Sequence, residues 1–169
     1  MVIAHYKRHV KRAFESEMDW YASAPNLVCA IRRAAHSRFN HKICMHQRRL
    51  GAALLAKAGE LLVVQQHAIA QAAAVGFSDL LQVVAQHSPK GCGTLFHYDV
   101  SVRLAHHLKL DVLAVYLHAG TRVGAKRWQP DRRHGPTLAP DLVARFRGLS
   151  CDHIENLLCI YAQHIVPKS

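Results

Sequence analysis

The chain has 169 residues, half of them hydrophobic and a fifth charged, and these proportions exclude an intrinsically disordered protein. Lysine and arginine exceed aspartate and glutamate by 11, and 14 histidines add positive charge below neutral pH. A chain of this length most simply forms one domain, and its basic excess favours nucleic acid as partner, ahead of an anionic surface or acidic protein, unless the charge serves solubility alone.

The five cysteines are odd in number and include no C-x-x-C pair, which predicts reduced thiols in a cytoplasmic protein. The first residues lack the apolar core of a signal peptide. The longest apolar stretch, residues 52–75, is interrupted by charged and polar side chains, so we expect no membrane association. His41 and His46 are five residues apart, a poor spacing for two ligands on one helix face, so we expect no metal and no cofactor.

Helical periodicity runs along most of the chain. In chain order it predicts helices over residues 6–20, 27–35, 50–75, 78–84, 95–108, 112–120, 141–146 and 150–164. Within 50–75, Gly51 and Gly59 are weak points, where a helix either ends or packs closely. Ser23, Ser78 and Asp111 are expected N-caps, because their short polar side chains suit helix starts. No stretch sustains the period-two alternation of a strand. The predicted fold class is therefore all-α, a single compact helical domain over residues 1–169, whose last helix, 150–164, docks on the core.

The densest basic run is residues 38–49, where Asn40 is expected to stop or cap a helix. If the run is helical, Lys42, His46 and Arg49 lie roughly on one side and face phosphates; otherwise they are simply solvated.

A turn rich in proline and glycine, residues 88–94, lies between two predicted helices and closes a helical hairpin. Gly91 and Gly93, one residue apart, can adopt positive φ angles. They leave backbone N–H groups uncovered at the start of the second helix, where the helix dipole favours an anion. The turn therefore predicts a phosphate site.

A hairpin of this form, helix, Pro-x-Gly-x-Gly, helix, resembles the helix-hairpin-helix element of DNA-binding proteins. With the segment 115–123 that follows, residues 78–124 resemble the core of the helix-hairpin-helix DNA glycosylases. The resemblance implies backbone contacts to duplex DNA from Lys90, Gly91, Gly93 and Thr94.

This chain departs from the glycosylases at both of their chemical groups. Thr94, Leu95 and Phe96 stand where lyase-type members carry a catalytic lysine, and Tyr116 stands at the acidic position. The resemblance therefore does not imply glycosylase chemistry for this chain. Segments 98–99, 116–121 and 154–159 also resemble a group of bacterial and phage-borne proteins, a likeness that implies no function.

Residues 121–140 are basic and interrupted by glycine and proline, which predicts a basic loop. Arg122, Lys126 and Arg127 are interleaved with Trp128, an arrangement that suits phosphate contacts with one stacked base. The loop is the second candidate nucleic-acid surface after the hairpin turn.

Three functions follow, in order of preference. The first is a helix-hairpin-helix protein that binds the backbone of nucleic acid, with duplex DNA as the expected form. The second is a divergent DNA glycosylase or a metal-independent nuclease or toxin that uses Tyr98, Asp99, His118 and Arg122. The third is a basic interaction protein, borne by a phage or plasmid, that docks on an acidic protein and performs no chemistry.

Overall fold

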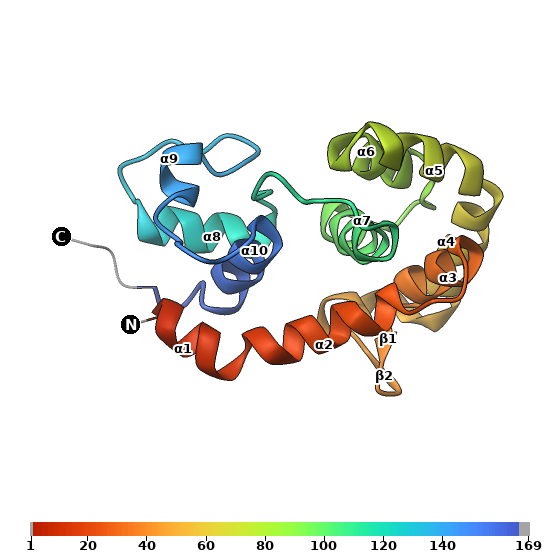
Figure 1. Ribbon diagram of the computed structural model, residues 1–169, viewed down its shortest axis with the longest axis horizontal. Helices are drawn as coiled ribbons and strands as arrows, with labels where there is room; N and C mark the ends of the chain where they lie inside the picture. The colour runs from red at the N-terminus through yellow and green to blue at the C-terminus, as the bar shows by residue number, and fades with distance from the viewer. Residues whose placement is uncertain (1, 166–169) are drawn as a thin grey trace. The chain divides into compact units, whose positions relative to one another are not determined.

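The structure is a computed structural model that describes residues 2–165, and its regular elements are helices except for one small sheet (Figure 1). The predicted all-α class is confirmed. The elements are α1 (Val2–His9), α2 (Lys11–Ala22), α3 (Leu27–His36), β1 (Arg38–Phe39), β2 (Lys42–Ile43), the 3-10 helix η1 (Met45–Leu50), α4 (Gly51–Val64), α5 (Gln66–Val75), α6 (Phe77–His87), α7 (Thr94–Leu108), α8 (Ala119–Trp128), α9 (Pro140–Val143) and α10 (Cys151–Ile160).

The contacts divide the chain into two compact units where the sequence predicted one domain. Unit 1 contains residues 2–14 and 112–165, and unit 2 contains residues 15–111, so one boundary falls inside α2. The other falls between Asp111 and Val112, inside the segment that resembles the glycosylase core. The hairpin therefore belongs to unit 2, while the segment expected to follow it belongs to unit 1.

Unit 2 is a helical bundle in which α3 packs on α4 and α7, and α6 packs on α5 and α7. Its interior is aliphatic and includes Ile31, Leu62 and Leu104, each completely buried. The cap of α3 is Asn26, whose Oδ1 accepts a hydrogen bond from the Cys29 backbone N–H at 2.9 Å, and not the predicted Ser23.

The long helix predicted over residues 50–75 is two helices, because the chain breaks at Gln65 between α4 and α5. The next helix, α6, has Gly76 as its N-cap, so the predicted cap Ser78 lies inside its first turn. The break shortens the longest apolar stretch. Across residues 2–165, no helix has both the length and the apolar character needed to span a bilayer.

The basic run 38–49 is not one helix. β1 and β2 form a two-stranded antiparallel hairpin in which Arg38 pairs with Ile43 and Phe39 with Lys42. The two turn residues have positive φ angles, 48° at Asn40 and 63° at His41, as in a type I′ turn. Asn40 therefore turns a hairpin where a helix stop was expected, since asparagine tolerates this conformation.

Unit 1 is built on the close approach of α8 to α10. A Cβ atom at Gly124 would lie 2.2 Å from the Leu158 carbonyl oxygen, and one at Gly120 would lie 2.8 Å from Cys159 Sγ. Glycine at both positions lets the two helices touch through their backbones. The buried Tyr6 of α1 joins this pair through its hydroxyl, which lies 2.8 Å from His153 Nδ1.

The predicted helix 112–120, with Asp111 as its cap, is absent. Residues 111–118 are irregular, and Tyr116 forms a bridge with Thr137. Leu117 donates its backbone N–H to Pro136 O, and Leu138 donates to Val115 O, both at 2.8 Å. Because residues 115–117 pair with residues 136–138, helix α8 begins only at Ala119. The first half of the predicted basic loop 121–140 is therefore helical.

Candidate nucleic-acid interface

The turn between α6 and α7 is a tight β-turn followed directly by a helix start. The Cys92 backbone N–H donates to Pro89 O at 3.1 Å, and Gly91 at the third position has a φ of +104°. That geometry is a type II turn, which requires glycine at this position. Gly93 is extended, with φ −100° and ψ −179°, and is the N-cap of α7. Positive φ was expected at both glycines and is found at Gly91 alone.

The N-terminus of α7 has no side-chain cap. Gly93 has no side chain to bind the first backbone N–H groups, and a Cβ built at Gly93 meets no atom within 4 Å. Thr94 is exposed beside it. The N–H groups of a first helical turn have no partner inside the helix and carry the positive end of the dipole. An anion can therefore approach Gly93 without displacing any side chain.

His97 lies one turn into α7 and contacts the same turn. Burial lowers the pKa of His97 below its ordinary value, and a hydrogen bond to the Cys92 backbone acts in the opposite direction. Burial likewise raises the pKa of the Cys92 thiol. Both side chains are therefore neutral at physiological pH, and the positive charge of the turn comes from Lys90, which is exposed.

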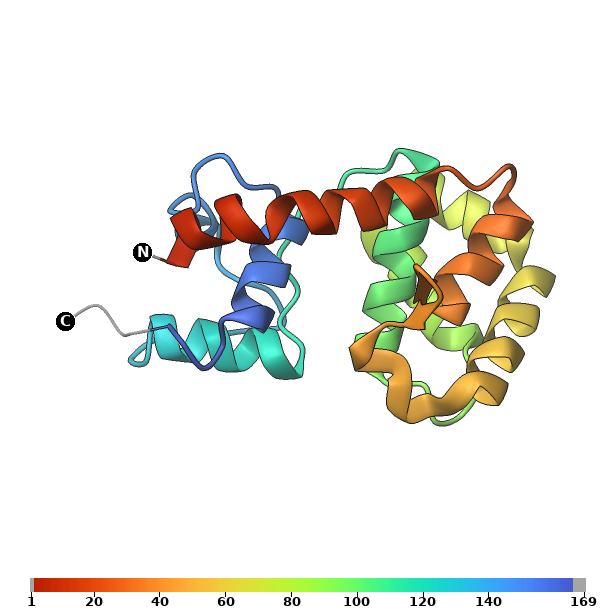
Figure 2. The same cartoon turned by 90° about the horizontal axis from the view of Figure 1, so that it is seen from below.

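The turn rests on the beginning of α4. Figure 2 shows the turn and the beginning of α4 side by side at one end of unit 2. The Leu54 Cδ2 atom would lie 3.2 Å from a Cβ at Gly91. Arg48 and Arg49, both exposed, lie in η1, which runs directly into α4. The sequence could not show that the turn lies against α4, because only the Leu54 contact relates the two segments.

The second predicted surface, residues 121–140, is not a flexible basic loop. The Arg122 guanidinium donates to three backbone carbonyls, Leu117 O at 3.0 Å, Gly135 O at 3.2 Å and His134 O at 3.4 Å. Arg122 therefore holds residues 134–135 against the start of α8.

The other members of that surface are on α8 or at its end. Arg127 donates to Gln163 O at 2.9 Å, whereas Lys126 is exposed. The Trp128 ring packs against the buried Phe146, with 4.4 Å between ring centroids. In this conformation the Trp128 indole packs against the core of unit 1.

The four residues of the catalytic hypothesis are divided between the units. Tyr98 and Asp99 are in unit 2, and His118 and Arg122 are in unit 1. Tyr98 is buried, with its ring against Phe77 at 6.0 Å between centroids. The Asp99 carboxylate points elsewhere and accepts a 2.5 Å hydrogen bond from Gln47. Arg103, four residues after Asp99 on α7, lies 3.9 Å from the Glu17 carboxylate.

His118 is buried in a polar network at the start of α8. Its Nε2 lies 2.6 Å from Glu155 Oε1, and Thr121 Oγ1 donates to the same carboxylate oxygen at 2.6 Å. All three side chains are buried. The sequence could not identify Glu155 as the partner, because it lies on α10.

This network is expected to stabilise unit 1. Replacing Thr121 with valine keeps the shape of the side chain but removes its hydrogen bond to a buried carboxylate. We expect unit 1 to lose about 2 kcal/mol of unfolding free energy, measured by urea denaturation. The matched change Thr137→Val removes a half-buried hydroxyl and should have a smaller effect. Equal effects of the two changes would contradict the assigned role of Thr121.

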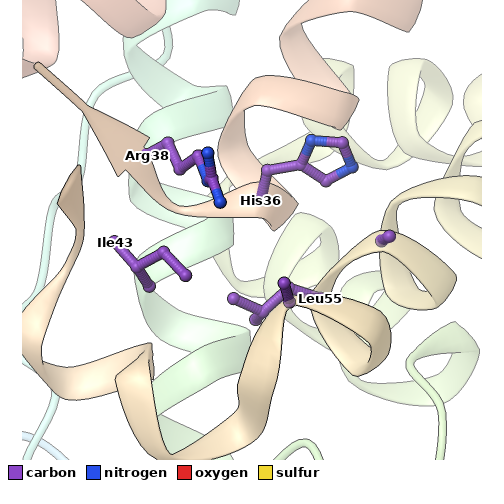
Figure 3. Close-up of a pocket in the computed structure, with 6 residues that line it drawn as sticks. His36, Arg38, Ile43 and Leu55 are labelled. Carbon is purple, nitrogen blue, oxygen red and sulfur yellow. The ribbon is translucent and has the colours of Figure 1, made fainter. Parts of the chain in front are cut away.

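A pocket of about 200 Å³ opens in unit 2 between the β-hairpin and α4 (Figure 3). His36, Arg38, Ile43 and Leu55 border it, with Ala52 and Ala56. Its volume is below the roughly 300–1,000 Å³ usual for small-molecule sites, and its lining is largely apolar. We therefore assign it no ligand.

Charge is distributed unequally between the units. By sequence, residues 1–14 and 112–169 hold 12 Lys and Arg against 4 Asp and Glu, while residues 15–111 hold 10 against 7. The net charges are therefore +8 and +3. The hairpin turn thus lies in the less basic unit.

Comparison of the chain with protein-family models, curated proteins and solved structures found no match.

Proposed function

We propose that this protein binds the backbone of nucleic acid, with duplex DNA as the expected form, through the hairpin between α6 and α7. One observation carries the proposal: the type II turn at Gly91 leads directly into an uncapped helix start at Gly93, with open space in front of it. Such a start binds phosphate oxygens through backbone N–H groups. The glycosylase-like resemblance of the hairpin agrees with this proposal.

The mode of binding follows from the groups available. The backbone N–H groups of Thr94 and Leu95 would donate to one phosphate, and Lys90 adds a positive charge beside them. Contacts of this kind fix position on the nucleic acid and read no base sequence. Affinity should therefore fall steeply with salt, as phosphate contacts release counterions.

The free state of all five cysteines agrees with a reducing compartment, and we propose a cytoplasmic location. The strongly basic unit 1 supplies additional long-range attraction for a polyanion.

The test is binding of labelled duplex DNA, single-stranded DNA and RNA at several salt concentrations. The double variant Lys90→Glu, Gly93→Glu places two carboxylates where the phosphate would lie, and we expect at least about a tenfold loss of duplex affinity. Gly93 is preferred to Gly91 for this change, because its φ is negative and its space is open. A glutamate at Gly91 would be strained and would press on Leu54.

Two control variants separate the site from general charge. Lys109→Glu changes the charge at the exposed far end of α7 and should leave affinity within about twofold. Gly93→Ala adds one methyl group in open space and should keep the fold. Unchanged duplex affinity in the folded double variant would refute the hairpin as the contact.

The same incubation tests the two other functions. Strands that stay intact after long incubation and alkali treatment are the result expected of a protein that only binds the nucleic-acid backbone. New fragments would favour catalysis. Absence of binding at low salt would instead favour an acidic protein partner for unit 1.

A further inference from the structure

Three side chains with metal-binding atoms meet in unit 2, away from the hairpin turn. One ligand atom each from Cys44, His46 and Asp99 lies within 4.8 Å of the other two. Cys44 directly follows Ile43, which is labelled in Figure 3. His46 lies in η1, and Asp99 lies in the second turn of α7. All three residues are partly buried.

The backbone around Cys44 is fixed from both sides. Its N–H donates to Ser37 O at 2.7 Å, and its carbonyl accepts from the Gln47 N–H at 2.9 Å. The Gln47 side chain, itself buried, donates through Nε2 to Asp99 Oδ2 at 2.5 Å. A hydrogen bond of this kind orients a carboxylate for a metal, as outer partners do in known sites. The set is therefore held in place before any ion arrives.

We propose that Cys44, His46 and Asp99 bind one Zn²⁺ ion. Thiolate sulfur, imidazole nitrogen and carboxylate oxygen are the three donor types that zinc takes in proteins. Hard ions such as Mg²⁺ and Ca²⁺ prefer all-oxygen sites and do not suit a thiolate. Three protein ligands leave a fourth tetrahedral position for water.

The surrounding charges suit a divalent cation. Glu17, whose pKa is raised chiefly by burial, lies 3.9 Å from the Arg103 guanidinium in the same region. With a thiolate at Cys44, the charges of the ligands Cys44 and Asp99 sum to −2, which one zinc ion neutralises. Zinc binds cysteine as the thiolate, so binding of the ion would release the Cys44 thiol proton.

The competing explanation is a metal-free pair of protonated His46 with Asp99, whose Nδ1 and Oδ2 atoms are 4.0 Å apart. That distance is at the limit of an ion pair, and the pair does not involve the Cys44 thiol, which has a hydrogen bond with the His46 backbone. A zinc ion would use all three side chains and would clamp η1 to α7. Zinc is therefore expected to stabilise unit 2.

The test uses the full chain, freed of metal and reduced, and titrated with Co²⁺ as a spectroscopic substitute for Zn²⁺. We expect one equivalent of Co²⁺ to produce a thiolate-to-cobalt charge-transfer band and tetrahedral d–d bands, both removed by Zn²⁺. Zinc should also raise the midpoint of thermal unfolding. Cys44→Ser should abolish the charge-transfer band, and Asp99→Asn should weaken binding at least about tenfold.

Matched controls use groups of the same type outside the cluster. Cys92→Ser and His41→Gln should leave the band and the affinity unchanged, which excludes adventitious binding by the other thiols and histidines. Cys44→Ser is close to isosteric, and the metal-free variant should unfold like the metal-free parent. Absence of a charge-transfer band, or a band that persists in Cys44→Ser, would overturn the proposal.

Discussion

Replacing Gly124 with alanine is expected to destabilise unit 1 by about 3 kcal/mol, near the upper end of the usual cost of overpacking. The added Cβ would lie 2.2 Å from Leu158 O and 3.0 Å from Leu158 C. These are backbone atoms, so no side-chain rotation relieves the clash. Helix α8 must move away from α10, and the buried contacts between them are lost. Urea and thermal denaturation measure the change.

Two other glycines of unit 1 serve as references for the loss of stability expected from Gly124→Ala. Gly120→Ala meets Cys159 Sγ at 2.8 Å, a side-chain atom that can move in part, so its cost should be intermediate. Gly135→Ala meets nothing within 4 Å and should leave stability nearly unchanged. If Gly124→Ala were no more destabilising than Gly135→Ala, the close approach of α8 and α10 would be wrong.

Replacing Arg103 with leucine is expected to cost unit 2 about 3–5 kcal/mol, the usual effect of removing one partner of a buried charge pair. The guanidinium is 4 % exposed and donates from Nη1 to Ala34 O at 3.0 Å and to Ser37 Oγ at 2.7 Å. It also lies over the Tyr21 ring, 4.8 Å from the centroid. It therefore caps the end of α3, where carbonyl groups lack helical partners.

The matched control is Arg32→Leu on α3. Its guanidinium forms a bidentate pair with Glu60 at 2.8 and 3.0 Å, but both side chains are largely exposed. Exposed pairs contribute little, so this change should have a much smaller effect than Arg103→Leu. Arg103→Lys keeps the charge but not the planar set of donors, and should recover only part of the loss. Equal effects of Arg103→Leu and Arg32→Leu would contradict the buried role of Arg103.

The two substitutions with the largest expected effects, Gly124→Ala and Arg103→Leu, lie in different units. Together they test whether the two units unfold independently. If the units unfold independently, Gly124→Ala lowers one transition and Arg103→Leu lowers the other. A single transition lowered equally by both changes would mean that the chain unfolds as one cooperative domain.

Several elements could be predicted from the sequence because their causes are local. The Pro89 to Gly91 spacing defines the turn, since a positive φ at the third position of a type II turn requires glycine. The start of α10 was expected at Ser150, which is its N-cap residue although its side chain makes no capping hydrogen bond, and the helix ends at Ile160 where residue 164 was expected. The all-α class follows from the same helical periodicity.

Other elements depend on distant partners. Val112, Val115 and Tyr116 have helical spacing, yet the segment is irregular, because its hydrogen bonds go to residues 136–138. The strands of the β-hairpin have two residues each, too short to show a period, so Asn40 was interpreted as a helix signal. Local patterns cannot decide between structures that differ only in long-range pairing.

The sequence by itself determined the charge, the helical class and the turn, because composition, periodicity and φ preferences are properties of neighbouring residues. Only the tertiary structure decided which groups meet. It divided the catalytic hypothesis between two units, joined His118 to Glu155 and brought Asp99 to Cys44 and His46. Such clusters form where helices distant in sequence pack together, and the packing of buried surfaces, which is not encoded in any single segment, fixes that arrangement.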